Sequence, residues 1–233
     1  MLKNLLDACG AAIAFYCVGY AFAFGGQEVV TETTFVGHNN FFLMGTGDNE
    51  VNSAFWFYEY AFAATATTIV AGTLAERCQM AAYFCYSIFL TGWVYPVVAH
   101  AIWSKNGFLS NANLDPGPSI GRGCIDFAGS GAVHLTGGMT AIVATRILGP
   151  RRGRFTDARG RPLNKARKFP GHSIALQLMG TMILWFGCEF FNKNTCRFNL
   201  YFDLTCCFLV ICSHRVWLQS RICIASDTRF KAW

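Results

Sequence analysis

One apolar stretch of the chain, Gly123–His134, contains residue types that could do chemistry. Asp126 is its only carboxylate, and His134, eight positions further on, is its only imidazole. If one α-helix carries both, they lie about two turns apart and roughly 80° around the axis. In the segment Cys124–Leu148 the only other ionisable groups are the first residue, a cysteine, and Arg146. A histidine within an apolar helix of membrane length is a candidate functional site.

Two interpretations of His134 stay open at this point. A pore histidine would stay neutral, because desolvation disfavours the imidazolium, and it could accept a proton or bond a small polar permeant. The alternative is a packing role, in which the imidazole hydrogen-bonds a neighbouring helix. Asp126 is expected to be structural, because a carboxylate at a helix start accepts hydrogen bonds from free N–H groups. A second role for Asp126, attracting a cation by its negative potential, is the alternative.

Other chemistries find little support in this stretch. The glycines at 129, 131, 137 and 138 favour close helix packing over phosphate binding, because no Lys-Ser/Thr pair follows them. No nucleophile, second histidine or metal-ligand set accompanies Asp126 and His134 on their helix. None of the eleven cysteines has metal-ligand spacing. The sequence therefore predicts no enzyme, no metal site and no cofactor.

The elements that must position these residues are predicted to be membrane helices. The chain has 233 residues, of which 53% are hydrophobic and only 14% charged, whereas soluble domains have about 25% charged residues. Five segments reach the roughly 20 residues that cross a bilayer, namely 5–24, 54–75, 79–103, 124–148 and 172–191. The sequence thus predicts an all-α polytopic membrane protein, with Pro96 kinking the third helix.

The charges of two connections predict the orientation. Residues 149–171 contain eight lysines and arginines, and residues 26–53 contain four carboxylates and no lysine or arginine. Because cytoplasmic loops are enriched in Lys and Arg, residues 149–171 should be cytoplasmic and 26–53 extracellular. The basic loop lacks regularly interleaved aromatic residues, so contact with anionic lipid is favoured over nucleic-acid binding.

Two further segments are interpreted from composition. Aromatic side chains crowd residues 55–62, as in an interfacial belt, or as in a cage that holds a cation against ring faces. Phe62, the deepest of them, suits the cage best. Residues 193–233 form a divergent tail outside the predicted fold, because its apolar run, Phe198–Cys212, is short and interrupted by Asp203.

Several motifs in this order resemble the ammonium transporter (Amt/methylammonium permease/Rhesus) family, in particular its plant and algal type. They are GYAFAFG at 19–25, AGTLAER at 71–77 leading to YPVVAH at 95–100, and DFAGSGAVH at 126–134. The resemblance covers about residues 1–192. It implies a fold of eleven helices, of which this chain would supply helices two to six, and assembly into a homotrimer in a membrane, most naturally the plasma membrane.

The resemblance also assigns roles to single residues. It implies that ammonium is recruited at an aromatic vestibule and passes as ammonia and a proton through a hydrophobic pore lined by histidines. His134 matches the first pore histidine and Asp126 the structural aspartate. Phe62 and Phe191 match the two gate phenylalanines, and Thr195 stands where a vestibule serine is expected.

The chain also departs from the family pattern. The first helix and helices seven to eleven have no counterpart, so a second pore histidine is missing. Glu59 replaces a glutamine, and Glu189 stands in an apolar helix end. The sequence therefore predicts an incomplete form of an ammonium transporter, explained by a truncated or misread gene product. The alternative is a non-transporting membrane fragment, or a subunit that inhibits full-length copies.

Overall fold

The regular secondary structure of the computed structural model is helical, with isolated β-bridges in the loops of its described part, which comprises residues 2–26, 33–45, 50–75, 77–113, 117–119, 121–151, 153–157, 161–169 and 171–195. These residues fall into two compact units, one up to Lys168 and one from Phe169 onward. The α-helices are α1 Leu2–Ala14, α2 Tyr20–Phe24, α3 Glu50–Leu74, α4 Met80–Phe89, α5 Tyr95–Trp103, α6 Thr136–Leu148 and α7 Ile174–Thr195. Helix α7 belongs to the second unit, and all other helices belong to the first.

Three π-helical turns extend α-helices into longer rods. They are Phe15–Gly19 between α1 and α2, Leu90–Val94 between α4 and α5, and Ser130–Leu135 before α6. The second of these turns ends at Val94, two residues before Pro96, the residue expected to kink this helix. Because proline lacks an N–H group, a wider helical turn at this place accommodates the missing bond.

Two of these rods, Leu2–Phe24 and Met80–Trp103, are long and apolar enough to cross a bilayer by length and composition. The expected number of five membrane spans therefore stays a prediction. Helix α3 covers the second expected span, and α7 starts within the fifth and continues past residue 192 to Thr195. Most of the predicted tail, residues 196–233, lies outside the described residues, as do parts of the 26–53 loop.

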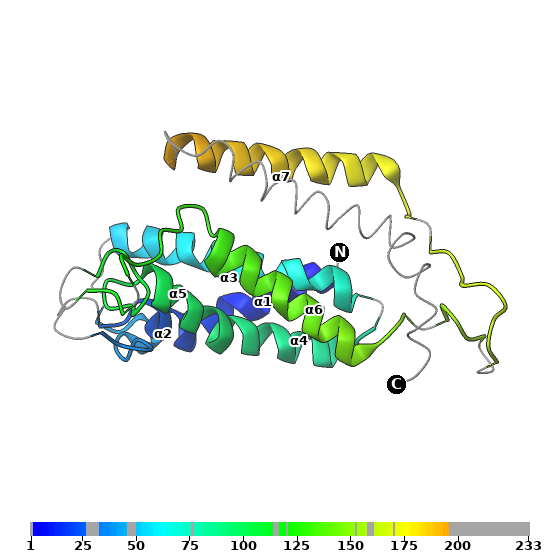
Figure 1. Ribbon diagram of the computed structural model, residues 1–233, viewed down its shortest axis with the longest axis horizontal. Helices are drawn as coiled ribbons and strands as arrows, with labels where there is room; N and C mark the ends of the chain where they lie inside the picture. Colours follow the sequence, from blue (N-terminus) through cyan, green and yellow to red (C-terminus); the bar gives the residue numbers. More distant parts are fainter. Residues whose placement is uncertain are drawn as a thin grey trace. The chain divides into compact units, whose positions relative to one another are not determined.

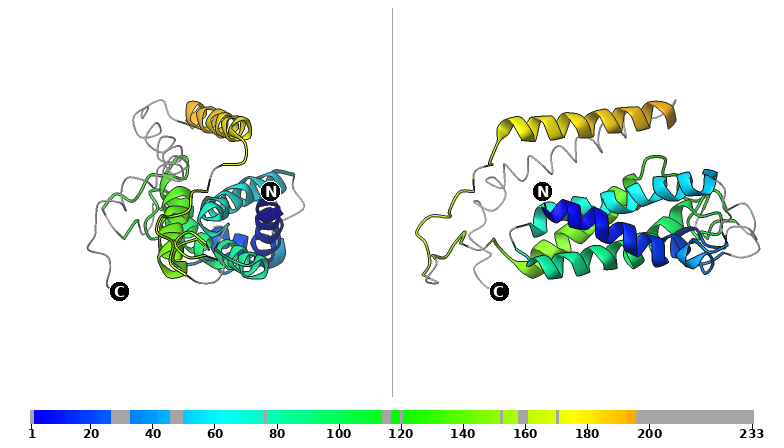
Figure 2. Two further views of the ribbon diagram at one scale, coloured as in Figure 1. Left: turned by 90° about the vertical axis from the view of Figure 1, so that its right-hand side faces the viewer. Right: turned by 180° about the vertical axis from the view of Figure 1, so that it is seen from behind.

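The helices of the first unit run side by side along one direction (Figures 1 and 2). Helix α3 packs against α1 and α6, α1 packs against α4, and α2 packs against α5. Small residues with no exposed surface lie at these contacts, including Ala11, Ala63, Ala66 and Ala99. Small side chains let helices approach closely, which matters in a membrane because dispersion contacts there carry much of the association energy.

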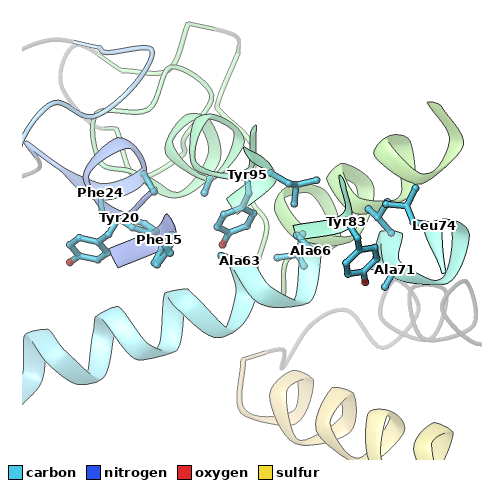
Figure 3. Packing of buried hydrophobic residues seen from close by; sticks show 14 residues of the cluster. Phe15, Tyr20, Phe24, Ala63, Ala66, Ala71, Leu74, Tyr83 and Tyr95 are labelled. Atoms are coloured by element: carbon cyan, nitrogen blue, oxygen red, sulfur yellow. The ribbon is translucent and has the colours of Figure 1, made fainter. Parts of the chain in front are cut away.

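Buried aromatic residues fill the space between the helices (Figure 3). Phe15, Tyr83 and Tyr95 are fully buried, and the Phe15 ring lies 6.1 Å from the Tyr20 ring and 6.3 Å from the Tyr95 ring. Hydroxyl groups add bonds between helices. The Tyr60 hydroxyl donates to the Ala8 carbonyl at 3.0 Å, linking α3 to α1. The Tyr86 hydroxyl donates to the Thr67 carbonyl at 2.5 Å, linking α4 to α3.

Each end of the first unit is held by polar side chains. At one end Lys3 Nζ donates to the Ala75 carbonyl at 2.6 Å, and Arg77 Nε donates to the Gly149 carbonyl at 2.8 Å. Cations are favoured at these positions because the last carbonyls of a helix lack partners within it. At the other end the buried His100 ring bonds the Ala23 carbonyl and the Thr34 hydroxyl, both at 2.8 Å. The residues near 3, 77 and 149 thus share one end, and those near 23, 34 and 100 share the other.

Candidate functional site

Asp126 stands before its helix and caps it. Oδ1 accepts hydrogen bonds from the backbone N–H groups of Gly129 and Ser130, both at 2.9 Å, and from the Ser130 hydroxyl at 3.2 Å. Oδ2 accepts from the N–H groups of Gly131 at 2.9 Å and Ala132 at 2.8 Å. One carboxylate therefore satisfies four of the N–H groups that a helix start leaves without partners.

The helix begins later than the sequence predicts. The expected segment starts at Cys124, whereas helical structure starts at Ser130. Gly129 has a φ of 80°, a left-handed conformation that glycine adopts without strain and that ends the preceding loop. Because Asp126 lies outside the helix, the expected 80° separation of Asp126 and His134 around one helix axis is wrong.

His134 lies in the π-helical turn Ser130–Leu135, five residues after Gly129, whose carbonyl accepts its backbone N–H at 2.9 Å. Its side chain is half-buried, and the Asp126 carboxylate lies close enough to interact with it electrostatically. Among the described residues, the imidazole has no hydrogen-bond partner. π-Helical turns are rare in proteins, and those that occur often lie at functional sites. One reason is that they turn a side chain away from regular helical spacing.

An aromatic pair lies next to this helix start. The ring centroids of Phe62 in α3 and Trp103 at the end of α5 are 5.5 Å apart, and the planes are inclined at 61°. The Trp103 indole N–H donates to the backbone carbonyl of Asp126 at 2.8 Å. Tyr58 lies against the other side of Phe62, with 4.9 Å between centroids. The capped loop, the pair and His134 thus belong to one contiguous part of the first unit.

Trp103 is a residue that sequence reasoning missed. It stands at the end of a predicted helix, where an indole reads as an interfacial anchor. Its contacts come from α3 and from the loop before α6, which are far from it in the chain. The bond from its N–H to the Asp126 carbonyl joins the indole to that loop.

The remaining predicted site residues, Phe191 and Thr195, lie in α7 of the second unit. Their backbone is helical, but their side chains lie outside the described part of the structure. The structure therefore brings Phe62, Asp126 and His134 together in one unit and says nothing of a contact between these residues and Phe191 or Thr195.

A helical bundle with two rods long and apolar enough to cross a bilayer fits the class of multi-pass membrane proteins. A family model described as Ammonium Transporter Family matches residues 1–197. The chain belongs to this family.

Individual relatives agree with the family match. The chain is 44% identical over 198 residues to ammonium transporter 1 member 2 of Arabidopsis thaliana and covers 37% of that protein. It is 42% identical over 186 residues to ammonium transporter 3 of Dictyostelium discoideum, of which it covers 38%. These alignments include 84% and 80% of the present chain, respectively. The chain thus spans less than two-fifths of the length of these curated relatives.

Solved structures show the same fold. The crystal structure of Candida albicans Mep2 is 29% identical to the chain with a TM-score of 0.61, over 81% of this chain and 38% of that one. Mep2 of Saccharomyces cerevisiae is 27% identical with a TM-score of 0.61, over 81% of this chain and 40% of that one. The all-helical architecture predicted from the sequence is confirmed at this level.

Proposed function

We propose that this chain serves ammonium transport across a membrane and contributes an aromatic entrance and one histidine to the conducting path. The observation that carries the proposal is the family match over residues 1–197. The geometry described above supports it. Phe62, Trp103 and His134 belong to one part of the first unit, and one capped loop positions two of the three.

The chemistry of these groups suits ammonium. Ring faces attract a cation and replace part of its lost hydration. A dry path excludes ions because desolvation is costly, but ammonium can release its proton and cross as neutral ammonia. Potassium, similar in charge and size, has no such route. An imidazole that is not held by another side chain can then bond ammonia or receive the proton. The His134 ring has no hydrogen-bond partner among the described residues, which favours the pore role over the packing role.

The proposed placement in the membrane follows the charges. Lys3, Arg77 and the segment 149–171 lie on the cytoplasmic side, and the segment 26–53 lies on the extracellular side of the plasma membrane. The shared end of Lys3, Arg77 and Gly149 in the first unit supports a common side for these residues. We further propose a homotrimer as the assembly, and we propose Phe191 as a gate phenylalanine and Thr195 as a vestibule residue.

The test measures uptake of radiolabelled methylammonium by cells that lack their own ammonium transporters. We expect His134→Ala to lower uptake at least tenfold, roughly the effect of losing one hydrogen bond to a charged or reacting group. His172→Ala is the matched control, because His172 is exposed and lies in the second unit. Uptake that persists in His134→Ala would overturn the role given to this residue.

A second candidate function is that the chain joins longer members of the family and inhibits them. The chain spans 37% to 38% of the curated relatives compared above, and its residues 1–197 match the family model. Co-expression with a full-length family member tests this function. Uptake by that member should fall as the chain accumulates, and unchanged uptake excludes the inhibitory role.

A further inference from the structure

A second acidic side chain, Glu59, lies in the middle of the first unit and has no role in the site described above. It is only 6% exposed, and its Oε2 has no hydrogen-bond partner. It lies on the buried face of α3, which continues one turn later with Ala63 and then with Ala66 and Val70, all three fully buried. Glu59 is the only ionisable side chain among these four.

Aromatic rings surround this part of α3. Phe55, one turn before Glu59, lies 6.4 Å from the Tyr20 ring and 5.5 Å from the Phe24 ring. Phe15 connects Tyr20 to Tyr95 through the ring contacts given above. In Figure 3 the Tyr95 side chain reaches from α5 toward α3, with its hydroxyl directed at the part that carries Ala63. The Glu59 carboxylate is within electrostatic reach of Tyr20, Tyr58 and Tyr95.

Two further polar atoms near Glu59 lack partners. The whole Tyr95 residue has no exposed surface, and its hydroxyl has no hydrogen bond. The indole N–H of Trp56, one turn before Tyr60 and stacked on its ring at 5.6 Å, is also buried and unbonded. Buried polar groups nearly always have partners, so these unpaired groups are candidates to bind a ligand.

The charge of that ligand follows from the groups present. A buried carboxylate without a partner is too costly to persist, so the acid must either hold a proton or be paired with a cation. No lysine, arginine or histidine within the described residues bonds or pairs with Glu59. The ionisable groups that face it, Tyr20 from α2, Tyr58 from α3 and Tyr95 from α5, are neutral phenols. A protein cation is therefore not available to it there.

We propose that Glu59 and the Tyr95 hydroxyl form a proton-exchange site for a small monovalent cation inside the first unit. Without the cation, Glu59 is a neutral carboxylic acid. An ammonium ion takes the place of the proton, so that the acid and ammonium give a carboxylate–ammonium pair and one released proton. The carboxylate and the hydroxyl oxygen accept N–H bonds from the ion, and the surrounding rings contribute cation–π attraction.

The site is a feature of this chain rather than of the pattern it resembles, where a glutamine stands at this position and supplies no charge to exchange. The choice of ammonium as the cation rests on the proposed function, whereas the exchange at Glu59 does not. Potassium has a similar size and no N–H groups. A comparison of potassium with ammonium therefore separates the proton exchange at Glu59 from selectivity for ammonium. A response to either ion supports the exchange site, and a response to ammonium alone adds selectivity.

The experiment follows the carboxyl group itself. The full chain is placed in lipid nanodiscs, and infrared difference spectra are recorded between ammonium chloride or potassium chloride and sodium chloride of equal ionic strength. We expect the carbonyl band of a protonated acid to disappear and a carboxylate band to appear, with proton release to a pH dye. Both signals should be absent in Glu59→Gln, which keeps the size and polarity of the side chain.

Two further variants keep the test decisive. Asp7→Asn removes a second buried carboxylate among the described residues, whose Oδ2 accepts a bond from the Tyr83 hydroxyl at 2.5 Å while its Oδ1 has no partner. This variant should retain the signals. Tyr95→Phe removes only the hydroxyl and should raise the half-saturating ammonium concentration about tenfold or more. An unchanged spectrum of the natural chain in both salts, or the same change in Glu59→Gln, overturns the proposal. This spectroscopic test does not measure transport. A negative result in the uptake test therefore does not decide whether Glu59 exchanges its proton.

Discussion

Three carboxylates in the first unit have different surroundings, which determine what each can do. Asp126 accepts five hydrogen bonds from a loop and a helix start. Asp7 is fully buried and accepts one from the Tyr83 hydroxyl. Glu59 accepts none at its buried Oε2. Asp7 Oδ1, like Glu59 Oε2, has no partner among the described residues. The three carboxylates therefore form a series from Asp126, bonded at both oxygens and structural, through Asp7, bonded at one oxygen, to Glu59, the most available to a ligand.

The structural end of this series gives the first prediction. Asp126→Ala should lower the free energy of unfolding by about 2 kcal/mol or more, because the cap is lost and backbone N–H groups are left without partners. Unfolding in mixed detergent, followed by tryptophan fluorescence, measures the loss. Asp126→Asn is the graded control, since its amide keeps one acceptor oxygen, and its loss should be smaller. Equal stability of the natural chain and Asp126→Ala would show that the bonds to Asp126 do not hold the helix start.

At the scale of elements, glycines decide how closely two helices approach. A Cβ atom at Gly137 of α6 would lie 2.9 Å from both the Ala66 carbonyl oxygen and the Ile69 Cβ of α3. The neighbouring Gly138 faces open space. Packing therefore requires a glycine at 137 but not at 138, although the two positions look equivalent in the sequence.

This difference gives the second prediction. Gly137→Ala should destabilise the chain by about 1–3 kcal/mol, because overpacking forces α6 away from α3. Gly138→Ala should be neutral or stabilising by up to about 1 kcal/mol, since alanine favours the helix. Thermal unfolding of both variants in the same detergent compares them directly. A Gly138→Ala variant as unstable as Gly137→Ala would contradict the packing assigned to this interface.

A second close contact joins the π-helical turns of the two membrane-length rods. A Cβ atom at Gly19 would lie 2.5 Å from the Thr91 carbonyl oxygen. The turns Phe15–Gly19 and Leu90–Val94 therefore meet backbone to backbone near the middle of the unit. Such a contact admits no larger side chain, and it holds the rod that carries Tyr20 against the rod that carries Tyr95.

For the whole molecule, the two held ends of the first unit make a prediction about sidedness. N-glycosylation acceptor sites inserted near Gly45 and near Lys165 should behave differently when the chain is made with microsomes. The site near Gly45 should receive a glycan, because its loop is proposed to be extracellular, and the site near Lys165 should not. The gel shift caused by the glycan, and its removal by a glycosidase, measures the outcome. A glycan near Lys165 alone would reverse the proposed orientation.

The sequence by itself determined the class, the family and the main helices of this protein. Long apolar runs can satisfy their backbone groups only as helices in an apolar environment, so composition and length predict helical segments near those observed. It also indicated which residues to examine, because a lone Asp126 and a lone His134 stand out in an apolar stretch.

Only the tertiary structure decided where the last helix of the first unit begins, which aromatic residues contact Phe62, and that Glu59 Oε2 is buried without a partner among the described residues. Each depends on side chains from elements far apart in the chain, which local periodicity does not encode. The start at Ser130 follows from five bonds to one carboxylate and a left-handed Gly129. The pairing of Phe62 with Trp103 and the isolation of Glu59 follow from packing between helices, which positions groups by shape rather than by spacing.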